Sequence, residues 1–129
     1  MYIEHLAIRC QDIEKMRSFY ESYFGATSNA KYINAKKEFE SYFLSFKEGS
    51  RLELMSRTDV SSLQKDIREE YIGLAHFAMR VGSEEKVNTL TEQLRNDGFT
   101  IIGEPRRTGD GYYESVVLDP ENNRIEITA

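Results

Sequence analysis

The chain has 129 residues, which is the size of one ordinary domain with a substantial buried core. Its formal net charge is −5 and its acidic residues are spread along the chain, which excludes a clustered basic face of the kind that binds nucleic acid. No segment approaches the roughly 18 apolar residues of a membrane span, and the single cysteine excludes an internal disulfide. We therefore expect a soluble, cytoplasmic protein that binds neither nucleic acid nor membranes.

The first half of the chain is predicted to form a strand, a helix and up to three further strands. Alternation over residues 2–10 predicts a strand with His5 and Arg9 on one face and apolar residues on the other. Asp12 is an N-cap for a helix that Gly25 ends, since glycine readily adopts the left-handed conformation at a helix C-terminus. Alternation and turn residues then predict a short strand at 31–33 and two strands at 40–46 and 51–56.

Residues 58–72 are rich in charge and serine. Their apolar residues, Val60, Leu63, Ile67 and Tyr71, fall at helical spacing, which would allow a short amphipathic helix. We interpret the segment as a connecting arm between two halves.

The second half repeats the order of the first. A strand at 74–81 carries His76, and Ser83 caps a helix that ends at Gly98. A strand at 100–103, a basic loop at 105–111 and two strands at 114–118 and 124–128 complete this half. The glycines of the loop give it the composition of a mobile lid.

One four-residue pattern occurs twice, as Arg51-Leu52-Glu53-Leu54 and as Arg124-Ile125-Glu126-Ile127. His5 precedes Glu53 by 48 residues and His76 precedes Glu126 by 50, and the chain has only these two histidines. We therefore predict an α+β fold of two tandem βαβββ modules that form a curved mixed sheet around a metal-binding cleft. One domain spans residues 1–129, with module 1 at about 1–57, the connecting arm at about 58–72 and module 2 at about 73–129.

The four repeated side chains form a candidate metal site. In each terminal strand the glutamate lies between aliphatic residues, so it points away from the apolar face, and each histidine is placed likewise on its own strand. Two imidazoles and two carboxylates suit a divalent ion such as Zn²⁺, Ni²⁺, Co²⁺, Mn²⁺ or Fe²⁺. The alternative is structural: each histidine hydrogen-bonded, and each glutamate paired with the arginine two residues before it.

These motifs resemble those of a known family. Glu4-His5-Leu6-Ala7-Ile8-Arg9, Gly73-Leu74-Ala75-His76-Phe77-Ala78, Asp119-Pro120-Glu121-Asn122-Asn123 and the two four-residue repeats are similar to motifs of the vicinal oxygen chelate superfamily, which includes glyoxalases, bleomycin-resistance proteins and dioxygenases. The resemblance covers essentially the whole chain and implies both the fold and a metal site at His5, Glu53, His76 and Glu126. A complete set of two histidines and two glutamates is most similar to glyoxalase I.

The resemblance to glyoxalase I implies a lyase that converts the hemithioacetal of methylglyoxal and a thiol to the 2-hydroxyacyl thioester. It implies one divalent ion, Ni²⁺, Zn²⁺ or Co²⁺, and glutathione or another low-molecular-weight thiol as cosubstrate. It also implies Glu126 as the base, with Glu53 as its near-symmetric counterpart. The family's asparagine for glutathione is not evident after Glu53, which leaves the thiol open.

Three arginines are candidates for binding the substrate. Arg9 matches a position that contacts glutathione in glyoxalase I, and its alternative is an ion pair with a neighbouring glutamate. Arg106 and Arg107 could contact an anionic thiol or be solvated. Other metal-dependent members of the superfamily, such as a thiol transferase, an epimerase or a dioxygenase, and a metal-free binding protein remain alternatives.

A symmetric homodimer is the expected assembly. Its modules would pair within one chain or be exchanged between two.

Overall fold

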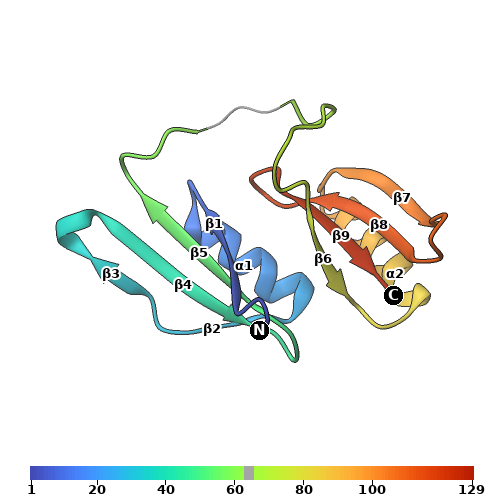
Figure 1. Cartoon of the computed structure of the whole chain (residues 1–129), viewed down its shortest axis with the longest axis horizontal. Helices are drawn as coiled ribbons and strands as arrows, with labels where there is room; N and C mark the ends of the chain where they lie inside the picture. The colour runs from blue at the N-terminus through green and yellow to red at the C-terminus, as the bar shows by residue number, and fades with distance from the viewer. Residues whose placement is uncertain (63–65) are drawn as a thin grey trace. The chain divides into compact units, whose positions relative to one another are not determined.

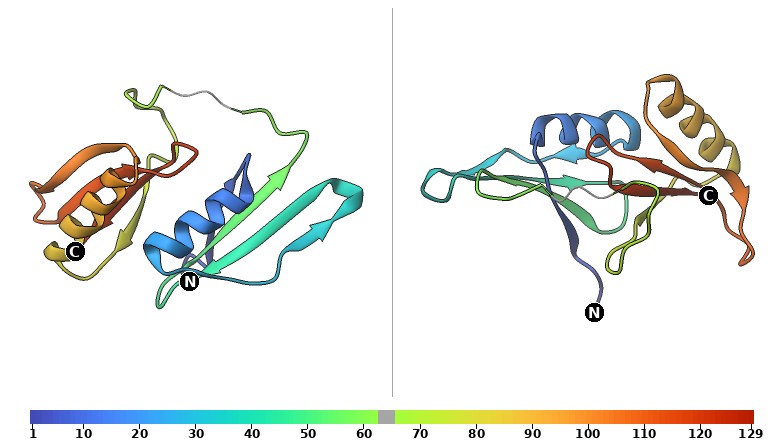
Figure 2. Two further views of the ribbon diagram at one scale, coloured as in Figure 1. Left: turned by 180° about the vertical axis from the view of Figure 1, so that it is seen from behind. Right: turned by 90° about the horizontal axis from the view of Figure 1, so that it is seen from above.

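The fold is described from a computed structural model of the chain, in which residues 1–62 and 66–129 are described. The chain forms two compact units, Met1–Gln64 and Lys65–Ala129. Each unit contains one mixed β-sheet and one α-helix that lies along a face of that sheet (Figure 1). The view from behind in Figure 2 shows the helix of each unit in front of its own sheet.

The first unit is built around a five-stranded sheet with the strand order β1-β5-β4-β2, in which β3 also pairs with β4. Its elements, in chain order, are β1 (His5–Arg9), α1 (Ile13–Phe24), β2 (Thr27–Ser28), β3 (Tyr32–Asn34), the 3₁₀ turn η1 (Ala35–Lys37), β4 (Phe39–Ser45) and β5 (Arg51–Arg57). Strand β1 pairs with β5 in parallel, and the other pairings are antiparallel.

Helix α1 has the boundaries that the sequence predicts. The Asp12 side chain accepts a hydrogen bond from the Lys15 backbone N–H at 2.9 Å, and Gly25 ends the helix with a φ of 64°. The buried side of the helix and of the sheet forms the core of this unit, with Met16, Phe19, Tyr20, Leu44, Leu52 and Leu54 among its least exposed residues. Because β5 alternates, Glu53 points to the opposite face of the sheet.

The second unit has a four-stranded sheet with the order β6-β9-β8-β7. Its elements are β6 (Phe77–Arg80), α2 (Glu84–Asn96), β7 (Ile101–Arg107), β8 (Tyr113–Leu118) and β9 (Arg124–Thr128). Strand β6 is parallel to β9, as β1 is to β5. The two tandem modules and the α+β class are thus confirmed, and each module has its own mixed sheet.

Helix α2 packs on its sheet through one apolar face. The Ser83 hydroxyl accepts from the Lys86 N–H at 3.2 Å and begins the helix, as predicted. Its apolar residues Val87 and Leu94 are buried with Val117, Ile125 and Ile127 of the sheet. Between them the buried Thr91 and Ser115 hydroxyls are hydrogen-bonded at 2.7 Å. Asp97 is the C-cap of this helix, and Gly98 follows it with a φ of 89°.

The prediction of a basic loop at 105–111 is wrong for its first part, because β7 continues to Arg107. The pairing of β7 with β8 shifts register between Ile101 and Gly103 and again between Gly103 and Arg106. Pro105 lies within this irregular stretch of an edge strand, where a missing backbone N–H costs little. Arg106 and Arg107 are therefore consecutive residues of a strand, and their side chains point to opposite faces of the sheet. Neither residue belongs to a mobile lid.

The predicted strand at 74–81 is shorter than expected, and His76 lies immediately before its first residue, Phe77. The described part of the connecting arm contains no helix. Leu63, which the helical spacing included, lies outside the described residues. Among the helices that the structure describes, none combines the length and the apolar character needed to cross a membrane.

Candidate metal centre

The first histidine–glutamate pair lies on the face of its sheet that α1 does not cover. His5 and Glu53 come from the parallel neighbours β1 and β5, in a register that places Ala7 beside Glu53. His5 Nε2 and Glu53 Oε2 are 3.8 Å apart. The flanking Leu52 and Leu54 are buried on the helix side, so the alternation of β5 directs Glu53 toward His5.

The second pair repeats this geometry in the other unit. His76 Nε2 and Glu126 Oε2 are 3.3 Å apart. Ile125 and Ile127 are both 0% exposed on the helix side of β9, so Glu126 points to the uncovered face. The structure therefore brings each histidine to the glutamate that the sequence repeat assigns to it.

Both pairs suit a divalent ion by donor type, and the pair in the second unit also suits it by spacing. Metal–nitrogen bonds of about 2.0–2.1 Å and metal–oxygen bonds of about 2.0–2.2 Å place neighbouring ligand atoms about 3.0–3.4 Å apart at angles of about 90–110°. The pair in the second unit lies within that range and the pair in the first is wider by about 0.4 Å. Among the described residues no three histidine, cysteine, aspartate or glutamate side chains gather in one ligand group.

A third acidic side chain, Glu114, lies beside Glu126 and was missed as a site residue from the sequence. Glu114 is 8% exposed, and Glu126 is its hydrogen-bond partner. Burial raises the pKa of Glu114, and the charge of Glu126 and the hydrogen bond to it raise that pKa further. One proton shared by the two carboxyl groups would allow them to lie in contact.

The strand registers explain why Glu114 has no counterpart in the first unit. The dipeptides Glu40-Ser41 and Glu114-Ser115 each lie near the start of the penultimate strand of their module, so the order of the sequence matches Glu114 with Glu40. By register, however, Glu114 pairs with the residue two positions after Glu126, and Ser41 pairs with the residue two positions after Glu53. Glu40 instead binds Lys31, which also contacts Glu14 of α1. A serine therefore occupies the equivalent of Glu114.

The two arginines of β7 point to different faces of its sheet. Arg106 Nη2 is 3.5 Å from Glu114 Oε1, on the face that carries Glu126. A Cβ at Gly103 would lie 3.3 Å from Arg106 Nη1, so the glycine leaves room for this guanidinium. Arg107 instead donates to Glu84 of α2 and to the Gly111 carbonyl. Arg106 thus joins the row of polar side chains beside Glu126, whereas Arg107 is held on the helix side.

Arg9 shares the uncovered face of the first sheet with His5, because both lie at odd positions of β1. It lies close to an ion pair between Arg57 and Asp59. Hydrogen bonds from Arg57 lower the pKa of Asp59, and the positive charge of Arg9 adds a small effect in the same direction. Arg9 therefore lies near the Asp59 carboxylate, but among the described residues it forms no ion pair with a glutamate, which was its structural alternative.

Glu4 is the second acidic residue that sequence reasoning did not single out. It lies next to His5 in the chain, and hydrogen bonds from His5 and Arg51 lower the pKa of its carboxyl group. The signal that could have identified Glu4 from the sequence is its position directly before the candidate ligand His5. The lateral contact with Arg51, 47 positions away, follows only from the pairing of β1 with β5.

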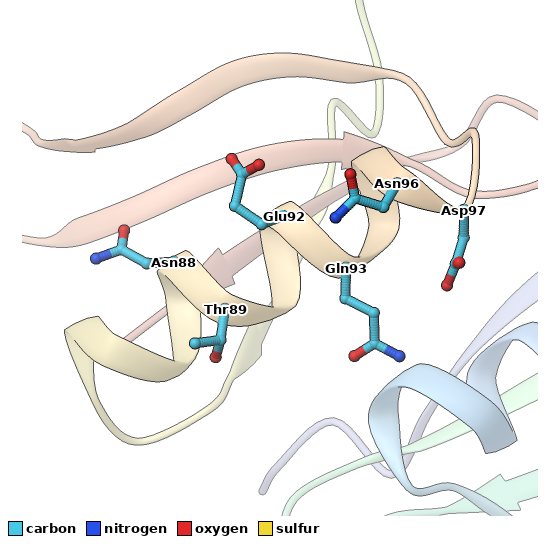
Figure 3. Close-up of a pocket in the computed structure, with 6 residues that line it drawn as sticks. All are labelled: Asn88, Thr89, Glu92, Gln93, Asn96 and Asp97. Carbon is cyan, nitrogen blue, oxygen red and sulfur yellow. The ribbon is translucent and has the colours of Figure 1, made fainter.

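A pocket lies elsewhere in the second unit and contains no predicted site residue. Its lining consists of one polar face of α2 and the residue that caps it: Asn88, Thr89, Glu92, Gln93, Asn96 and Asp97 (Figure 3). This face is opposite the buried Val87, Thr91 and Leu94. The pocket is therefore a feature of the outer helix surface and is separate from the histidine–glutamate pairs.

Comparison with known proteins decides the family. The model of the glyoxalase/bleomycin resistance protein/dioxygenase superfamily matches residues 2–127. The chain belongs to this superfamily. Its two tandem modules are those that the resemblance in the sequence implies.

Several solved structures share the fold. A possible glyoxalase from Bacillus cereus is 27% identical with a TM-score of 0.72, and the match covers 100% of this chain and 99% of that one. The trypanothione-dependent glyoxalase I of Leishmania major is 23% identical with a TM-score of 0.78, covering 99% of this chain and 86% of that one. Glyoxalase I of Zea mays is 22% identical with a TM-score of 0.76, and the chain covers only 44% of its length. The comparison with curated proteins finds no match.

Proposed function

We propose that the protein is a glyoxalase I-like metalloenzyme that isomerises a methylglyoxal–thiol hemithioacetal to the 2-hydroxyacyl thioester. The observation that carries the proposal is the pair of histidine–glutamate contacts, 3.8 and 3.3 Å long, on the uncovered face of each sheet. His5, Glu53, His76 and Glu126 would together hold one Ni²⁺, Zn²⁺ or Co²⁺. A symmetric homodimer is the assembly that we expect.

The chain's own residues would carry the proton transfer. When bound, the divalent ion stabilises the negative charge that develops on the two substrate oxygens. Glu126 removes the proton from the carbon next to the carbonyl and returns it to the neighbouring carbon. Its side chain is 18% exposed, so few water molecules compete for that proton. Glu53, which is 14% exposed, is the counterpart on the other side of the proposed site.

The thiol would be recognised by arginine. Arg9 and Arg106 lie on the faces that carry the two pairs, and a guanidinium binds a carboxylate through two parallel hydrogen bonds. Glutathione and other acidic low-molecular-weight thiols offer such carboxylates. The Leishmania major structure is that of a trypanothione-dependent glyoxalase I, which supports testing thiols other than glutathione. Arg107 instead forms an ion pair with Glu84, which joins strand β7 to helix α2.

The test is conversion of the methylglyoxal–glutathione hemithioacetal by metal-free protein before and after addition of Ni²⁺, Co²⁺ or Zn²⁺. Metal-dependent turnover that His76→Ala abolishes is the expected result. Binding of one ion per chain is expected by calorimetry, and two ions per chain would show that each pair binds separately. Metal binding without turnover with any thiol would favour another metal-dependent activity of the superfamily, such as an epimerase. If no metal bound, the proposal would be wrong.

A further inference from the structure

The carboxylate of Glu4 connects the candidate ligand His5 to an arginine of the neighbouring strand. His5 Nδ1 and Glu4 Oε2 are 2.5 Å apart, and an ionised carboxylate can only accept, so the imidazole donates. The other oxygen, Glu4 Oε1, accepts from Arg51 Nε at 2.7 Å and from Arg51 Nη2 at 2.5 Å. Both carboxylate oxygens are therefore engaged, and the direction of the imidazole–carboxylate hydrogen bond is defined.

Arg51 also supports the ring of His5 from a second side. Its guanidinium lies over the Phe43 ring, 4.2 Å from the centroid. Phe43 in turn meets the imidazole edge to face, with centroids 5.3 Å apart and planes at 87°. The Arg51 backbone N–H donates to the Glu4 carbonyl at 3.0 Å, which fixes the start of β1 against β5. One arginine thus holds both groups that contact the imidazole.

This arrangement has a direct consequence for the position of the imidazole proton. With Nδ1 donating to Glu4, the neutral ring leaves Nε2 with a free lone pair, and only an unprotonated nitrogen can bind a metal. Nε2 is the atom that faces Glu53, at a distance of 3.8 Å that is too long for a hydrogen bond. The unprotonated Nε2 of His5 therefore keeps its lone pair available for a metal ion.

The second unit lacks this support, although its sequence repeat is the same. Arg124, the counterpart of Arg51, donates to Glu70 and to the carbonyls of Ile67 and Glu69. The residue before His76 is Ala75, which has no carboxylate. Among the described residues no hydrogen bond to His76 Nδ1 is formed. The two histidines therefore differ in what determines their tautomer.

From this difference we propose that Glu4, anchored by Arg51, is a positioning residue that holds His5 in the Nδ1–H tautomer and presents Nε2 to a divalent ion. The inference rests on the proposed function in so far as His5 is a metal ligand. Its tautomer, however, can be measured in metal-free protein. A carboxylate behind a ligating histidine typically contributes about 10- to 100-fold in metal affinity. Because Glu4 and His5 are 49% and 39% exposed, we expect the lower end, about 10-fold.

The test uses protein with ¹⁵N-labelled histidine, whose two imidazoles can each be assigned with a His76→Ala variant. Two-bond ¹H–¹⁵N spectra of metal-free protein, at a pH high enough for neutral rings, show which nitrogen carries the proton. We expect His5 as the Nδ1–H form in the wild type and a shift to the Nε2–H form in Glu4→Ala. The Co²⁺ affinity of Glu4→Ala is expected to fall about 10-fold.

Glu70→Ala is the matched control, because it removes the carboxylate that binds Arg124 without touching either histidine. It is expected to leave the His5 tautomer and the Co²⁺ affinity unchanged. The proposal would be overturned by a wild-type His5 in the Nε2–H form, by an unchanged tautomer in Glu4→Ala, or by equal Co²⁺ affinities of the two proteins. If the wild type binds no metal, the proposed function fails, and the tautomer of His5 still decides whether Glu4 positions the ring.

Discussion

Replacement of Glu126 by glutamine separates its role as a base from its role as a ligand. Glutamine has the same shape and keeps one oxygen that can face His76, but it cannot accept a proton as a carboxylate does. In the wild type, Glu126 lies against Glu114, which is 8% exposed and whose pKa is raised by burial and by the charge of Glu126. The amide introduced by Glu126→Gln can donate to Glu114 without a like charge beside it.

The expected loss of activity follows from what a positioned base contributes. General base catalysis is worth about 10²- to 10⁴-fold, and each factor of ten corresponds to about 1.36 kcal/mol of activation free energy. Because Glu126 is only 18% exposed, water is a poor substitute, and we expect the upper part of the range. We therefore predict that kcat falls by about 10³- to 10⁴-fold, or about 4–5 kcal/mol. Thermal stability should be unchanged or slightly higher, because the repulsion with Glu114 is removed.

The assay is isomerisation of the hemithioacetal at saturating substrate, with the metal content and Tm of each variant measured in parallel. Glu53→Gln is the matched control, since Glu53 has the same place in the first unit and a similar distance to its histidine. We expect it to retain more activity than Glu126→Gln. A Glu126→Gln protein with metal bound and near-normal kcat would refute the assignment of the base, and a larger loss in Glu53→Gln would transfer that role to Glu53.

Three further predictions concern single side chains. Because the pKa of Glu114 is raised in the folded, metal-free protein, this carboxyl group contributes stability that is present below its ordinary pKa of 4.5 and is lost as the pH rises through its folded pKa. Glu114→Gln should therefore lose less Tm than the wild type as the pH rises above 4.5, and parallel Tm curves would contradict this. Thr91→Val leaves the buried Ser115 hydroxyl without its acceptor, because the Thr91 hydroxyl already donates to the Val87 carbonyl at 2.6 Å. It should cost about 1–3 kcal/mol in urea denaturation and more than Ser115→Ala; equal costs would refute this direction of the hydrogen bond. Arg9→Met should raise the KM for an acidic thiol adduct about 10-fold with a smaller change in kcat, and an unchanged KM would exclude Arg9 from binding the thiol.

Local patterns in the sequence predicted most elements of both modules. The cap at Asp12 and the left-handed glycine at Gly25 bound α1 as expected, because capping depends on residues within one turn. The last strand was predicted with its observed limits, Arg124–Thr128, since its alternation is regular and a turn of favourable composition precedes it. The prediction for β7 failed because Gly103 and Pro105 have loop propensities, whereas an edge strand tolerates both through its register shifts.

The hydrogen-bond partners within the candidate centre were less accessible to sequence reasoning. Glu114 was matched with Glu40 by their order in the chain, but a one-residue difference in register directs a strand residue to the opposite face. The two adjacent arginines of β7 were treated alike in the sequence. In the structure one joins Glu114 and the other joins Glu84 of the helix, because successive strand residues alternate.

The sequence by itself determined the two modules and the face on which each histidine and glutamate lies. Alternation and capping are local properties, and the repeat provides each of them twice. Only the tertiary structure decided which charged groups meet: Glu4 with His5 and Arg51, and Glu114 with Glu126 and Arg106. These contacts depend on strand register and on pairing between segments far apart in the chain, so equal sequence repeats acquire unequal surroundings.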